Sequence, residues 1–324
     1  MKFLIVGFGS IGQQHLLAIK TLYPTAEVAL LRREVSHKIT GVCCQFVHVK
    51  KAAEWRPNYV IIASPASVHI EQYEYFMALE SVQSILIEKP ISDAVTSLLP
   101  THFQVGNKTV FVGYDMRFTP LFLQLERLVN KAQLGAIIGV SIRVGQALPS
   151  WRNSEDFRQD VSAIKSLGGG VLRELSHEID YALALFGKPS SVLAKTVSGK
   201  WLSLPVEDKA YVHWDMALGD SAYGLSMMMD MVSETPFRTL CIEYEEGRIN
   251  ADWLENSITI EAHGAKVEKQ LMTPSSALQA EILYLTQSTS ASRWNACDLH
   301  QAKEVLYQIE KIEASAKEGK RLYD

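Results

Sequence analysis

The chain lacks the features that mark several large classes of protein. Its 324 residues contain no apolar run that approaches the ~20 residues needed to span a bilayer. No signal peptide precedes the first apolar segment, and the net charge of −4 provides no basic surface for nucleic acid. We therefore expect a cytoplasmic protein that has neither a membrane nor a nucleic acid as its partner.

Cysteine is also scarce. The four cysteines show no CxxC spacing and have no histidines at the spacing of zinc ligands, so we expect no metal site. The adjacent pair Cys43-Cys44 could form a vicinal disulfide, but free cysteine behaves as a small hydrophobic residue. We therefore expect buried, reduced thiols.

The composition that remains, 47% hydrophobic and 21% charged, suits a globular protein of about two domains. Residues 1–118 alternate short apolar runs with helical segments, which indicates a doubly wound parallel Rossmann sheet. Residues 119–324 carry longer strands of alternating pattern in succession, which favours an α+β domain on a large open mixed or antiparallel sheet. The pattern over Asp298–Ala316 predicts a C-terminal helix that packs back onto the body.

A glycine turn near the start of the chain is its strongest motif. The apolar run Lys2–Val6 leads into Gly7-Phe8-Gly9-Ser10-Ile11-Gly12, and a helical segment follows. The first glycine permits a tight turn, the second lets a pyrophosphate approach, and the third lets the helix pack closely. The helix N-terminus adds N–H groups and partial positive charge. We predict a dinucleotide site that uses Gly7, Gly9, Ser10, Ile11 and Gly12; the alternative is a turn that binds nothing.

The end of the second predicted strand bears on the choice of cofactor. An acidic residue about 20 residues past the glycines binds the ribose of NAD, whereas an Arg accommodates the 2′-phosphate of NADP. Arg32-Arg33 occupies this place, and the nearest acid, Glu34, comes too late. The pair favours NADP over NAD. Alternatively, the arginines are solvated and stack on the adenine of either cofactor.

The next two strands end in further candidates for the cofactor site. Ser64-Pro65 belongs to a run of small residues that suits a backbone close to the cofactor, and His69 follows as an early helix residue. Glu88-Lys89-Pro90 lies at the mouth of a parallel sheet, where ligands bind. Lys89 could donate a proton or hydrogen bond to a substrate oxygen; the alternative is a strand-end salt bridge between Glu88 and Lys89.

A second constellation lies in the segment Gly168–Asp180, where three glycines open a predicted helix. Glu174, His177 and Asp180 are each three residues apart, so they share one helix face. An acid beside a histidine can orient the imidazole as a general base. The alternatives are a polar surface face and a metal site, and the absence of another ligand cluster argues against the metal.

Taken in order along the chain, these motifs resemble the glucose–fructose oxidoreductase / inositol dehydrogenase / rhizopine-catabolism (Gfo/Idh/MocA) family. Val112–Phe118 and the closing Ser315–Lys320 also fit this family, so the resemblance covers essentially the whole chain. It implies a dinucleotide-binding Rossmann domain over residues 1–118 and a substrate-binding and oligomerisation domain over 119–324. It also implies hydride transfer between NAD(P) and a sugar, polyol or sugar-acid hydroxyl or carbonyl.

The resemblance implies roles for individual residues as well. Lys89 would polarise the reacting oxygen or relay its proton, and His177 would be the acid or base. Asp180 would align the helix face or contact substrate. Tyr114 and Arg117 would shape the substrate site near the nicotinamide.

One departure from the family pattern concerns the partner of His177. Many polyol dehydrogenases of the family carry an Asp four residues before this histidine, where this chain has Arg173. Glu174 follows one residue later and stays a candidate substrate contact, but a helix turns about 100° per residue, so it cannot simply replace that Asp. Either the helix begins elsewhere or the histidine has a different partner.

The segment Gly145–Arg152 resembles family members of bacterial surface-sugar metabolism. Trp151 could stack on a sugar face, and Arg152 could bind a carboxylate or phosphate, which makes acidic sugars plausible substrates. The alternative is a loop anchored by a buried Trp151.

Two wider expectations follow from the family. The open sheet face of the second domain would need cover, so we expect a homodimer or homotetramer. The alternatives to a dehydrogenase are a non-catalytic dinucleotide-binding sensor and a lyase or glycosidase that keeps its NAD tightly bound.

Overall fold

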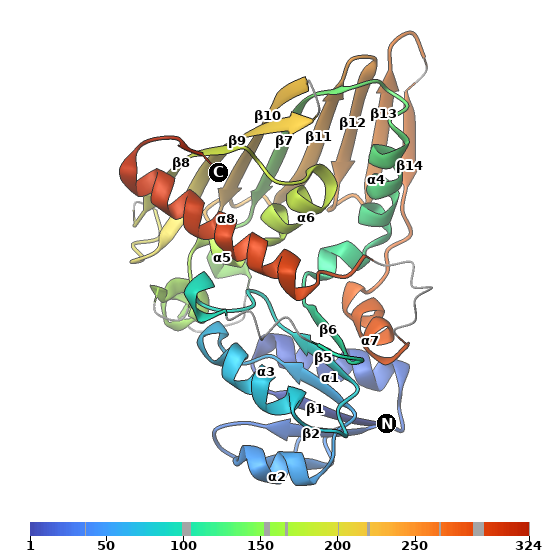
Figure 1. The fold of residues 1–324 in the computed structure, drawn as a ribbon, viewed down its shortest axis with the longest axis vertical. Coiled ribbons are helices and arrows are strands. Elements are labelled where there is room, and N and C mark those ends of the chain that lie inside the picture. Colours follow the sequence, from blue (N-terminus) through green and yellow to red (C-terminus); the bar gives the residue numbers. More distant parts are fainter. Residues whose placement is uncertain are drawn as a thin grey trace. The chain divides into compact units, whose positions relative to one another are not determined.

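The computed structural model describes residues 1–35, 37–98, 105–151, 156–165, 168–199, 201–218, 221–265, 267–287 and 295–323. The chain forms two compact units (Figure 1). Unit 1 comprises Met1–Phe118 and Ser276–Leu306, and unit 2 comprises Thr119–Ser275 and Tyr307–Asp324. The sequence-based division into a dinucleotide-binding domain over residues 1–118 and a substrate-binding domain over residues 119–324 stays a prediction. The compact units differ from it because Ser276–Leu306 belongs with the N-terminal residues.

Unit 1 is built on a six-stranded parallel sheet, as the sequence predicted. Its order is β3-β2-β1-β4-β5-β6, which is the doubly wound Rossmann order. The strands are β1 (Lys2–Val6), β2 (Glu27–Leu31), β3 (Cys44–Phe46), β4 (Tyr59–Ile62), β5 (Ser84–Ile87) and β6 (Thr109–Val112). The central strands are buried on both faces, which explains why they read as nearly continuous apolar runs.

Helices flank this sheet. They are α1 (Ser10–Leu22), α2 (Val49–Glu54), α3 (His69–Met77) and α7 (Ala277–Gln287), together with the 3₁₀ segments η1 (Ala66–Val68), η2 (Val95–Ser97) and η4 (Asp115–Phe118). α7 packs against α1 and η4, and its Ile282 and Leu285 join Ile19 of α1 in one apolar core. The segment that follows α7 reaches β6, where Cys297 pairs with Val112 as an isolated bridge.

Unit 2 is built on a nine-stranded sheet of order β14-β13-β12-β11-β7-β10-β9-β8-β15. The strands are β7 (Ile137–Gly145), β8 (Ser191–Ser198), β9 (Glu207–Leu218), β10 (Ser221–Asp230), β11 (Phe237–Tyr244), β12 (Gly247–Asp252), β13 (Ser257–Ala262), β14 (Glu268–Leu271) and β15 (Leu322–Tyr323). Neighbouring strands are antiparallel except for β7 and β10, which are parallel. The predicted fold class, a Rossmann sheet plus a large mixed sheet, is therefore confirmed.

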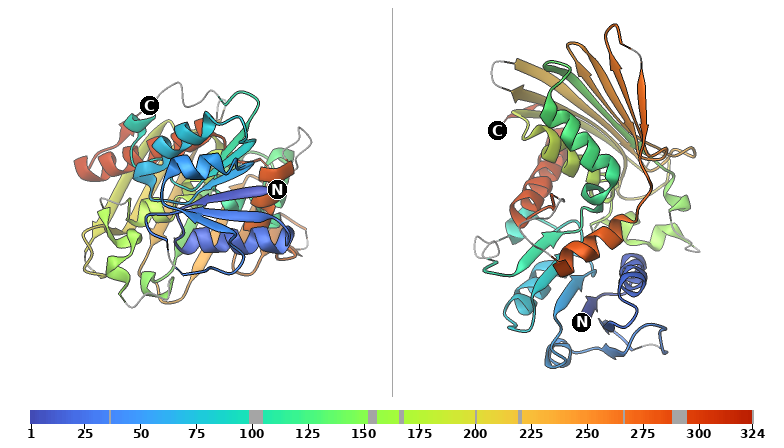
Figure 2. Two further views of the ribbon diagram at one scale, coloured as in Figure 1. Left: turned by 90° about the horizontal axis from the view of Figure 1, so that it is seen from below. Right: turned by 90° about the vertical axis from the view of Figure 1, so that its right-hand side faces the viewer.

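One face of the large sheet is covered by helices (Figure 2, right). These are α4 (Pro120–Lys131), α5 (Val171–Glu174), α6 (His177–Phe186) and the later turns of α8 (Leu299–Glu318). Strand β7 shows the resulting alternation, because Ile142 is buried toward the helices whereas Ser141 and Arg143 are exposed on the other face. Ser315 of α8 bonds to the edge of the sheet, where its hydroxyl accepts from the Ala194 amide at 3.0 Å.

Short 3₁₀ segments occupy the connection from β7 to α5, where the structure describes it. They are η5 (Leu148–Ser150), η6 (Phe157–Gln159) and η7 (Val161–Ala163). Helix α4, which precedes β7, begins at Pro120, and the Thr119 hydroxyl caps it by accepting from the Phe122 amide at 3.2 Å.

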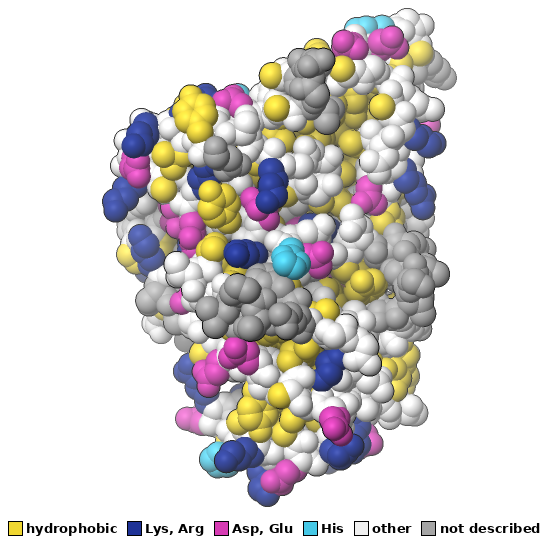
Figure 3. Space-filling model, in the orientation of Figure 1, with side chains coloured by type: hydrophobic (Ala, Val, Ile, Leu, Met, Phe, Trp, Pro, Cys, Tyr) yellow, Lys and Arg dark blue, Asp and Glu magenta, His cyan; other side chains and the backbone are white. Residues whose placement is uncertain are grey.

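The cysteines differ from the expectation of buried thiols. Cys297 is buried, but Cys43 is exposed because it precedes the short edge strand β3, and Cys44 and Cys241 are partly exposed. Within the described ranges, no helix combines the length and the apolar composition that a membrane span requires. Figure 3 shows basic and acidic side chains interspersed over the described part of the visible face.

Candidate functional site

The glycine turn after β1 is shaped by the space around each glycine. Gly7 has φ +87°, and a Cβ there would lie 2.6 Å from the Ala63 carbonyl oxygen. A Cβ on Gly12 would lie 2.8 Å from the Gly7 carbonyl oxygen, so α1 packs tightly against the turn. Gly9 has nothing within 4 Å of its Cβ position among the described residues. Backbone atoms thus leave no room for a side chain at Gly7 or at Gly12, whereas the space beside Gly9 is open.

Helix α1 begins directly at this opening. Gly9 is its N-cap, and Ser10 and Ile11 form the first turn. Among the described residues, no side chain caps this end and no acidic residue lies in the first turn. The partial positive charge of the helix N-terminus is therefore not offset locally.

The carboxyl ends of four parallel strands lie beside the turn. Backbone bonds of 2.8 Å join them in sequence: the Ala63 amide donates to Val6, the Glu88 amide to Ile62, and the Gly113 amide to Ile87. Because ligands of doubly wound sheets bind at this edge, Ser64-Pro65 and the partly exposed Lys89 follow the strands at the expected place.

Arg32 and Arg33 differ in their surroundings. Arg32 directly follows β2, and its guanidinium lies 5.8 Å from the ring centroid of Phe8 in the glycine turn. Arg33 is exposed. The structure thus brings Arg32, but not Arg33, to the residues of the turn.

Glu88 points into unit 1. Its side chain is only 10% exposed, and its Oε1 atom accepts from His15 Nε2 of α1 at 2.6 Å. A Cβ on Gly113 would lie 3.1 Å from Glu88 Oε2, so this glycine leaves room for the carboxylate. Sequence reasoning missed His15. The available signal was its place three residues after Gly12, on the same buried helix face.

His69 is buried at the start of α3. Its Nε2 atom lies 2.7 Å from the Ser64 carbonyl oxygen and its Nδ1 atom 3.0 Å from the Pro90 carbonyl oxygen. Burial lowers the pKa of the His69 imidazole, while the carbonyl groups and the Glu88 carboxylate oppose that shift. Gln72, one turn later, accepts from the Ser64 hydroxyl at 2.6 Å.

A second buried acid lies in α7. Both carboxyl oxygens of Glu281 are buried without a hydrogen-bond partner among the described residues. Burial raises the pKa of Glu281 well above its ordinary value, and the nearby charges of Asp115 and Glu88 raise it further. This residue was not predicted from the sequence, because its environment depends on packing against segments distant in the chain.

Tyr114 and Arg117 are both almost fully buried. The Arg117 guanidinium donates from Nη1 to Gln301 Oε1 at 2.8 Å and to the Asn295 carbonyl oxygen at 3.3 Å. These contacts join η4 to the first turn of α8 and to the segment just before it. The environment of Arg117 favours a structural role, and its assignment to a substrate site stays a prediction.

The segment with His177 is not one helix. α5 ends at Glu174 and α6 begins at His177, because the backbone leaves the helical conformation at Leu175 (φ −98°, ψ 28°). The Asp180 amide then donates to the Ser176 carbonyl, which starts α6. The expected shared face of Glu174, His177 and Asp180 is therefore wrong for Glu174, which belongs to the preceding helix.

Arg173 explains part of this local arrangement. Its guanidinium donates to Glu313 of α8, so the side chain at the family's usual Asp position is used within unit 2. In α6, His177 is partly exposed whereas Asp180 is fully buried. The two side chains thus lie in one turn of α6, but a ligand could reach His177 and could not reach Asp180.

Trp151 is partly exposed, and Arg152 lies outside the described residues. The indole nitrogen of Trp151 is itself buried and finds no acceptor in the described part of the chain. Over the same described ranges, no three His, Cys, Asp or Glu side chains come together as metal ligands would.

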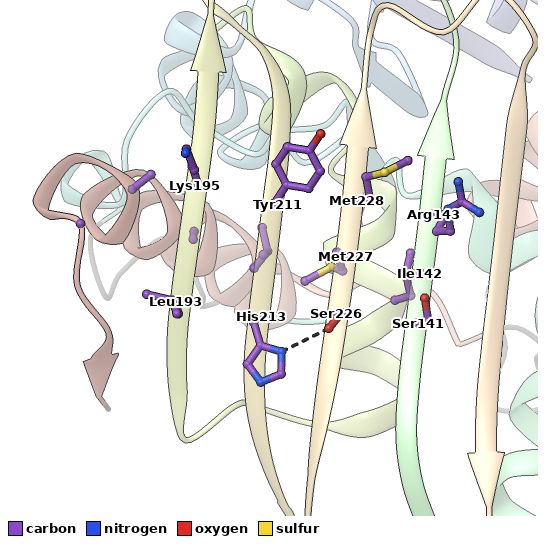
Figure 4. Close-up of a pocket in the computed structure, with 14 residues that line it drawn as sticks. Ser141, Ile142, Arg143, Leu193, Lys195, Tyr211, His213, Ser226, Met227 and Met228 are labelled. Carbon is purple, nitrogen blue, oxygen red and sulfur yellow. Dashed lines mark hydrogen bonds between the residues drawn. The ribbon is translucent and has the colours of Figure 1, made fainter.

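A separate hollow of about 710 Å³ lies over strands β7 to β10 of unit 2 and the end of α8 (Figure 4). Its outward-facing side chains include Arg143, Lys195, Tyr211 and Met228, and His213 Nδ1 lies 3.2 Å from the Ser226 hydroxyl. None of the residues that the sequence predicted for catalysis or binding lines it.

Two family models match the sequence. Residues 1–114 match the oxidoreductase family with an NAD-binding Rossmann fold, and residues 122–249 match the GFO/IDH/MocA C-terminal domain. The two matched ranges follow one another along the chain and leave only a short interval between them.

Individual relatives are distant. The inositol 2-dehydrogenase of Mycolicibacterium smegmatis is 24% identical over 147 residues, which are 42% of this chain and 41% of that protein. The chain thus matches only about two fifths of the length of this curated relative.

Two solved structures share the fold over nearly the whole chain. A levoglucosan dehydrogenase in complex with NADH and L-sorbose has a TM-score of 0.81 at 16% identity and covers 100% of this chain and 98% of its own. The UDP-N-acetylglucosamine 3-dehydrogenase of Acidithiobacillus ferrooxidans has a TM-score of 0.78 at 21% identity and covers 98% of both chains.

Proposed function

This chain belongs to the GFO/IDH/MocA oxidoreductase family, and we propose that it transfers a hydride between NAD(P) and a sugar, polyol or sugar acid. The observation that carries the proposal is the open Gly9 at the head of α1, beside the strand ends that lead to Ser64 and Lys89. Inositol, levoglucosan and sugar-nucleotide dehydrogenases among the similar proteins support the substrate class.

The residues around the turn fit a dinucleotide. The N-terminus of α1 offers N–H groups to the pyrophosphate, and the absence of a Cβ on Gly9 leaves the approach open. Ser64-Pro65 would line the neighbouring strand end. When bound, the nicotinamide supplies the hydride donor or acceptor, and the chain's own residues bind and orient both reactants.

We favour NADP over NAD because Arg32 lies against Phe8 of the turn, where a 2′-phosphate would gain a charged partner. Arg32→Ala should weaken NADPH binding about tenfold, the scale of one charge-assisted contact, and leave NADH binding nearly unchanged. The exposed Arg33→Ala is the matched control. Fluorescence titration with both nucleotides measures the effect, and equal loss for NADH and NADPH would overturn the preference.

Lys89 is the proposed proton-handling residue. Oxidation of an alcohol removes the hydroxyl proton as well as the hydride, so a group is needed that accepts that proton. Lys89 is partly exposed directly after β5, and its amine could bond to the reacting oxygen. We propose His177 as a second acid or base, with Asp180 holding its helix turn.

The test begins with fluorescence titration of the purified protein with NADPH and NADH, followed by a turnover screen over polyols, sugars and sugar acids. Lys89→Ala should bind nucleotide normally and lose about 100-fold in turnover, the usual contribution of a general acid or base. Lys50→Ala, an exposed lysine of α2, is the control. Full turnover in Lys89→Ala would refute the assignment.

Nucleotide that stays bound without exchange would favour a lyase or glycosidase, and no binding at all would favour a sensor or scaffold.

We also propose a homodimer or homotetramer that covers the outer face of the large sheet. This face exposes apolar side chains that line the hollow over β7 to β10, among them Leu193 at 38% and Tyr211 at 45%. Tyr211→Glu should dissociate the oligomer in light-scattering chromatography, whereas an unchanged mass would exclude this face.

A further inference from the structure

Two buried histidines of unit 1 have no role in the proposed reaction. His15 lies in α1, the helix that follows the glycine turn, and His69 begins α3. Their exposed fractions are 0% and 1%. His15 contacts Glu88, the residue before Lys89, and His69 contacts Pro90, the residue after it.

His15 holds the residue before Lys89. Its Nε2 atom donates to Glu88 Oε1 at 2.6 Å, and both side chains are buried. The carboxylate also fills the space that Gly113 leaves open at the end of β6. A short bond between buried partners is favourable when made and costly when one partner is removed. The bond therefore ties α1 to the strand end that carries Lys89.

His69 holds the residue after Lys89. Its Nδ1 atom lies 3.0 Å from the Pro90 carbonyl oxygen, while Nε2 lies 2.7 Å from the Ser64 carbonyl oxygen. A carbonyl oxygen only accepts hydrogen bonds. Both contacts are therefore hydrogen bonds only when both ring nitrogens carry protons, which is the imidazolium form. A neutral ring donates to one carbonyl and turns a lone pair toward the other.

The charge on His69 depends on its surroundings. Burial disfavours the imidazolium, whereas the carbonyl groups of Ser64 and Pro90 and the carboxylate of Glu88 favour it. Glu71 is the acidic residue in the first turn of α3 itself, and it is exposed. Glu88 is thus the anion that acts on His69 while it bonds to His15.

We propose that His15 and His69 are positioning residues that clamp Glu88-Lys89-Pro90 from both sides and so fix where the Lys89 amine is presented. The importance of that amine rests on the proposed function, but the clamp itself does not. Because a displacement of about 1 Å can cost about 100-fold in rate, loosening either side should slow turnover without removing any group that touches substrate.

The first test measures the clamp without activity. Because burial lowers the pKa of His69, the neutral ring dominates near neutral pH, and the clamp then requires its single proton on Nδ1, which faces the Pro90 carbonyl oxygen. Nitrogen-15 spectra of the imidazole report which nitrogen carries that proton. Hydrogen exchange of the peptide over residues 84–91 should accelerate about fivefold in His15→Leu and in His69→Leu, because each variant loses a hydrogen bond that contributes roughly 1 kcal/mol. His48→Leu, at an exposed position, is the control. Unchanged exchange in both variants would overturn the clamp, and a single proton on Nε2, directed at Ser64, would overturn the part that His69 plays in it.

The second test separates positioning from mere folding. His15→Gln keeps a donor for Glu88 and should restore exchange and kcat to near wild type, whereas His15→Leu lowers kcat and leaves nucleotide Kd and substrate KM nearly unchanged. His69→Gln keeps one donor, as the neutral imidazole does, and should exchange more slowly than His69→Leu. If Lys89→Ala is fully active, the proposed function fails while the exchange and imidazole results still decide the clamp. If His15→Leu exchanges like wild type while Lys89→Ala is inactive, the clamp fails alone.

Discussion

The two units use sequence in different ways to position their candidate residues. In unit 1, the candidates directly follow the ends of parallel strands. Backbone hydrogen bonds of 2.8 Å from the residues after these strands to Val6, Ile62 and Ile87 hold the strand ends side by side. In unit 2, the candidates lie on short helices whose junction depends on packing against the large sheet. The order of the strands therefore predicts where the candidates of unit 1 lie. Helical spacing does not predict where the candidates of unit 2 lie.

The glycines offer the largest test of this difference. Gly7→Ala should destabilise unit 1 by about 3 kcal/mol through backbone strain at φ +87° and overlap with Ala63, and should abolish nucleotide binding. Gly170→Ala, at φ +121° beside Glu207 in unit 2, should also destabilise the protein but leave nucleotide binding intact. Urea unfolding and nucleotide titration measure both.

The matching control is Gly9→Ala, because nothing lies within 4 Å of its Cβ position in the described part of the chain. This variant should fold normally and bind nucleotide weakly. Loss of nucleotide affinity in Gly170→Ala equal to that in Gly7→Ala would remove the distinction between the units.

His177 tests whether unit 2 contributes chemistry at all. His177→Asn should lower turnover about 100-fold with little change in thermal stability, since the side chain is partly exposed and acts as an acid or base. His263→Asn, at an exposed turn after β13, is the control. Wild-type kcat and pH profile in His177→Asn would confine the proton chemistry to unit 1.

Glu281 gives the smallest expected effect and depends on pH. Its pKa is raised in the folded protein, so its stabilising contribution is complete below the ordinary pKa of about 4.3 and is lost as pH rises toward the folded value. Glu281→Gln cannot ionise and should exceed the wild type by about 1 kcal/mol at pH 7.5, but not at pH 4. Thermal unfolding across pH measures the difference.

The exposed Glu71→Gln is the control for this pH series and should follow the wild type throughout. A stability difference for Glu281→Gln that stays constant from pH 4 to pH 7.5 would show that the carboxyl is already ionised in the folded state.

Most strands of both sheets were predictable, because each of these buries a run or an alternation of apolar residues. The mostly exposed β14 has no such pattern and was not predicted. The elements that sequence reasoning missed depend on distant partners. Helix α7 buries residues around much of its circumference, Glu281 included, so it lacks a clear apolar stripe. Strands β3 and β15, of three and two residues, exist only because a neighbouring strand pairs with them.

The candidate site divides along the same line. The glycine turn and the strand ends follow from local pattern, but the bond from His15 to Glu88 spans 73 residues of chain and has no local signature. The interruption at Leu175-Ser176 contains neither Gly nor Pro, so nothing in the spacing of Glu174 and His177 announces it.

The return of Ser276–Leu306 to unit 1 has a consequence for protein synthesis. The apolar face of α1 is completed by Ala280, Ile282 and Leu285, which the ribosome adds long after Phe118. At 5 to 20 residues per second, that wait lasts roughly 10 to 40 seconds. A nascent chain therefore carries a parallel sheet and an α1 without their α7 cover while unit 2 is being made, and this interval is when a chaperone would have most to protect.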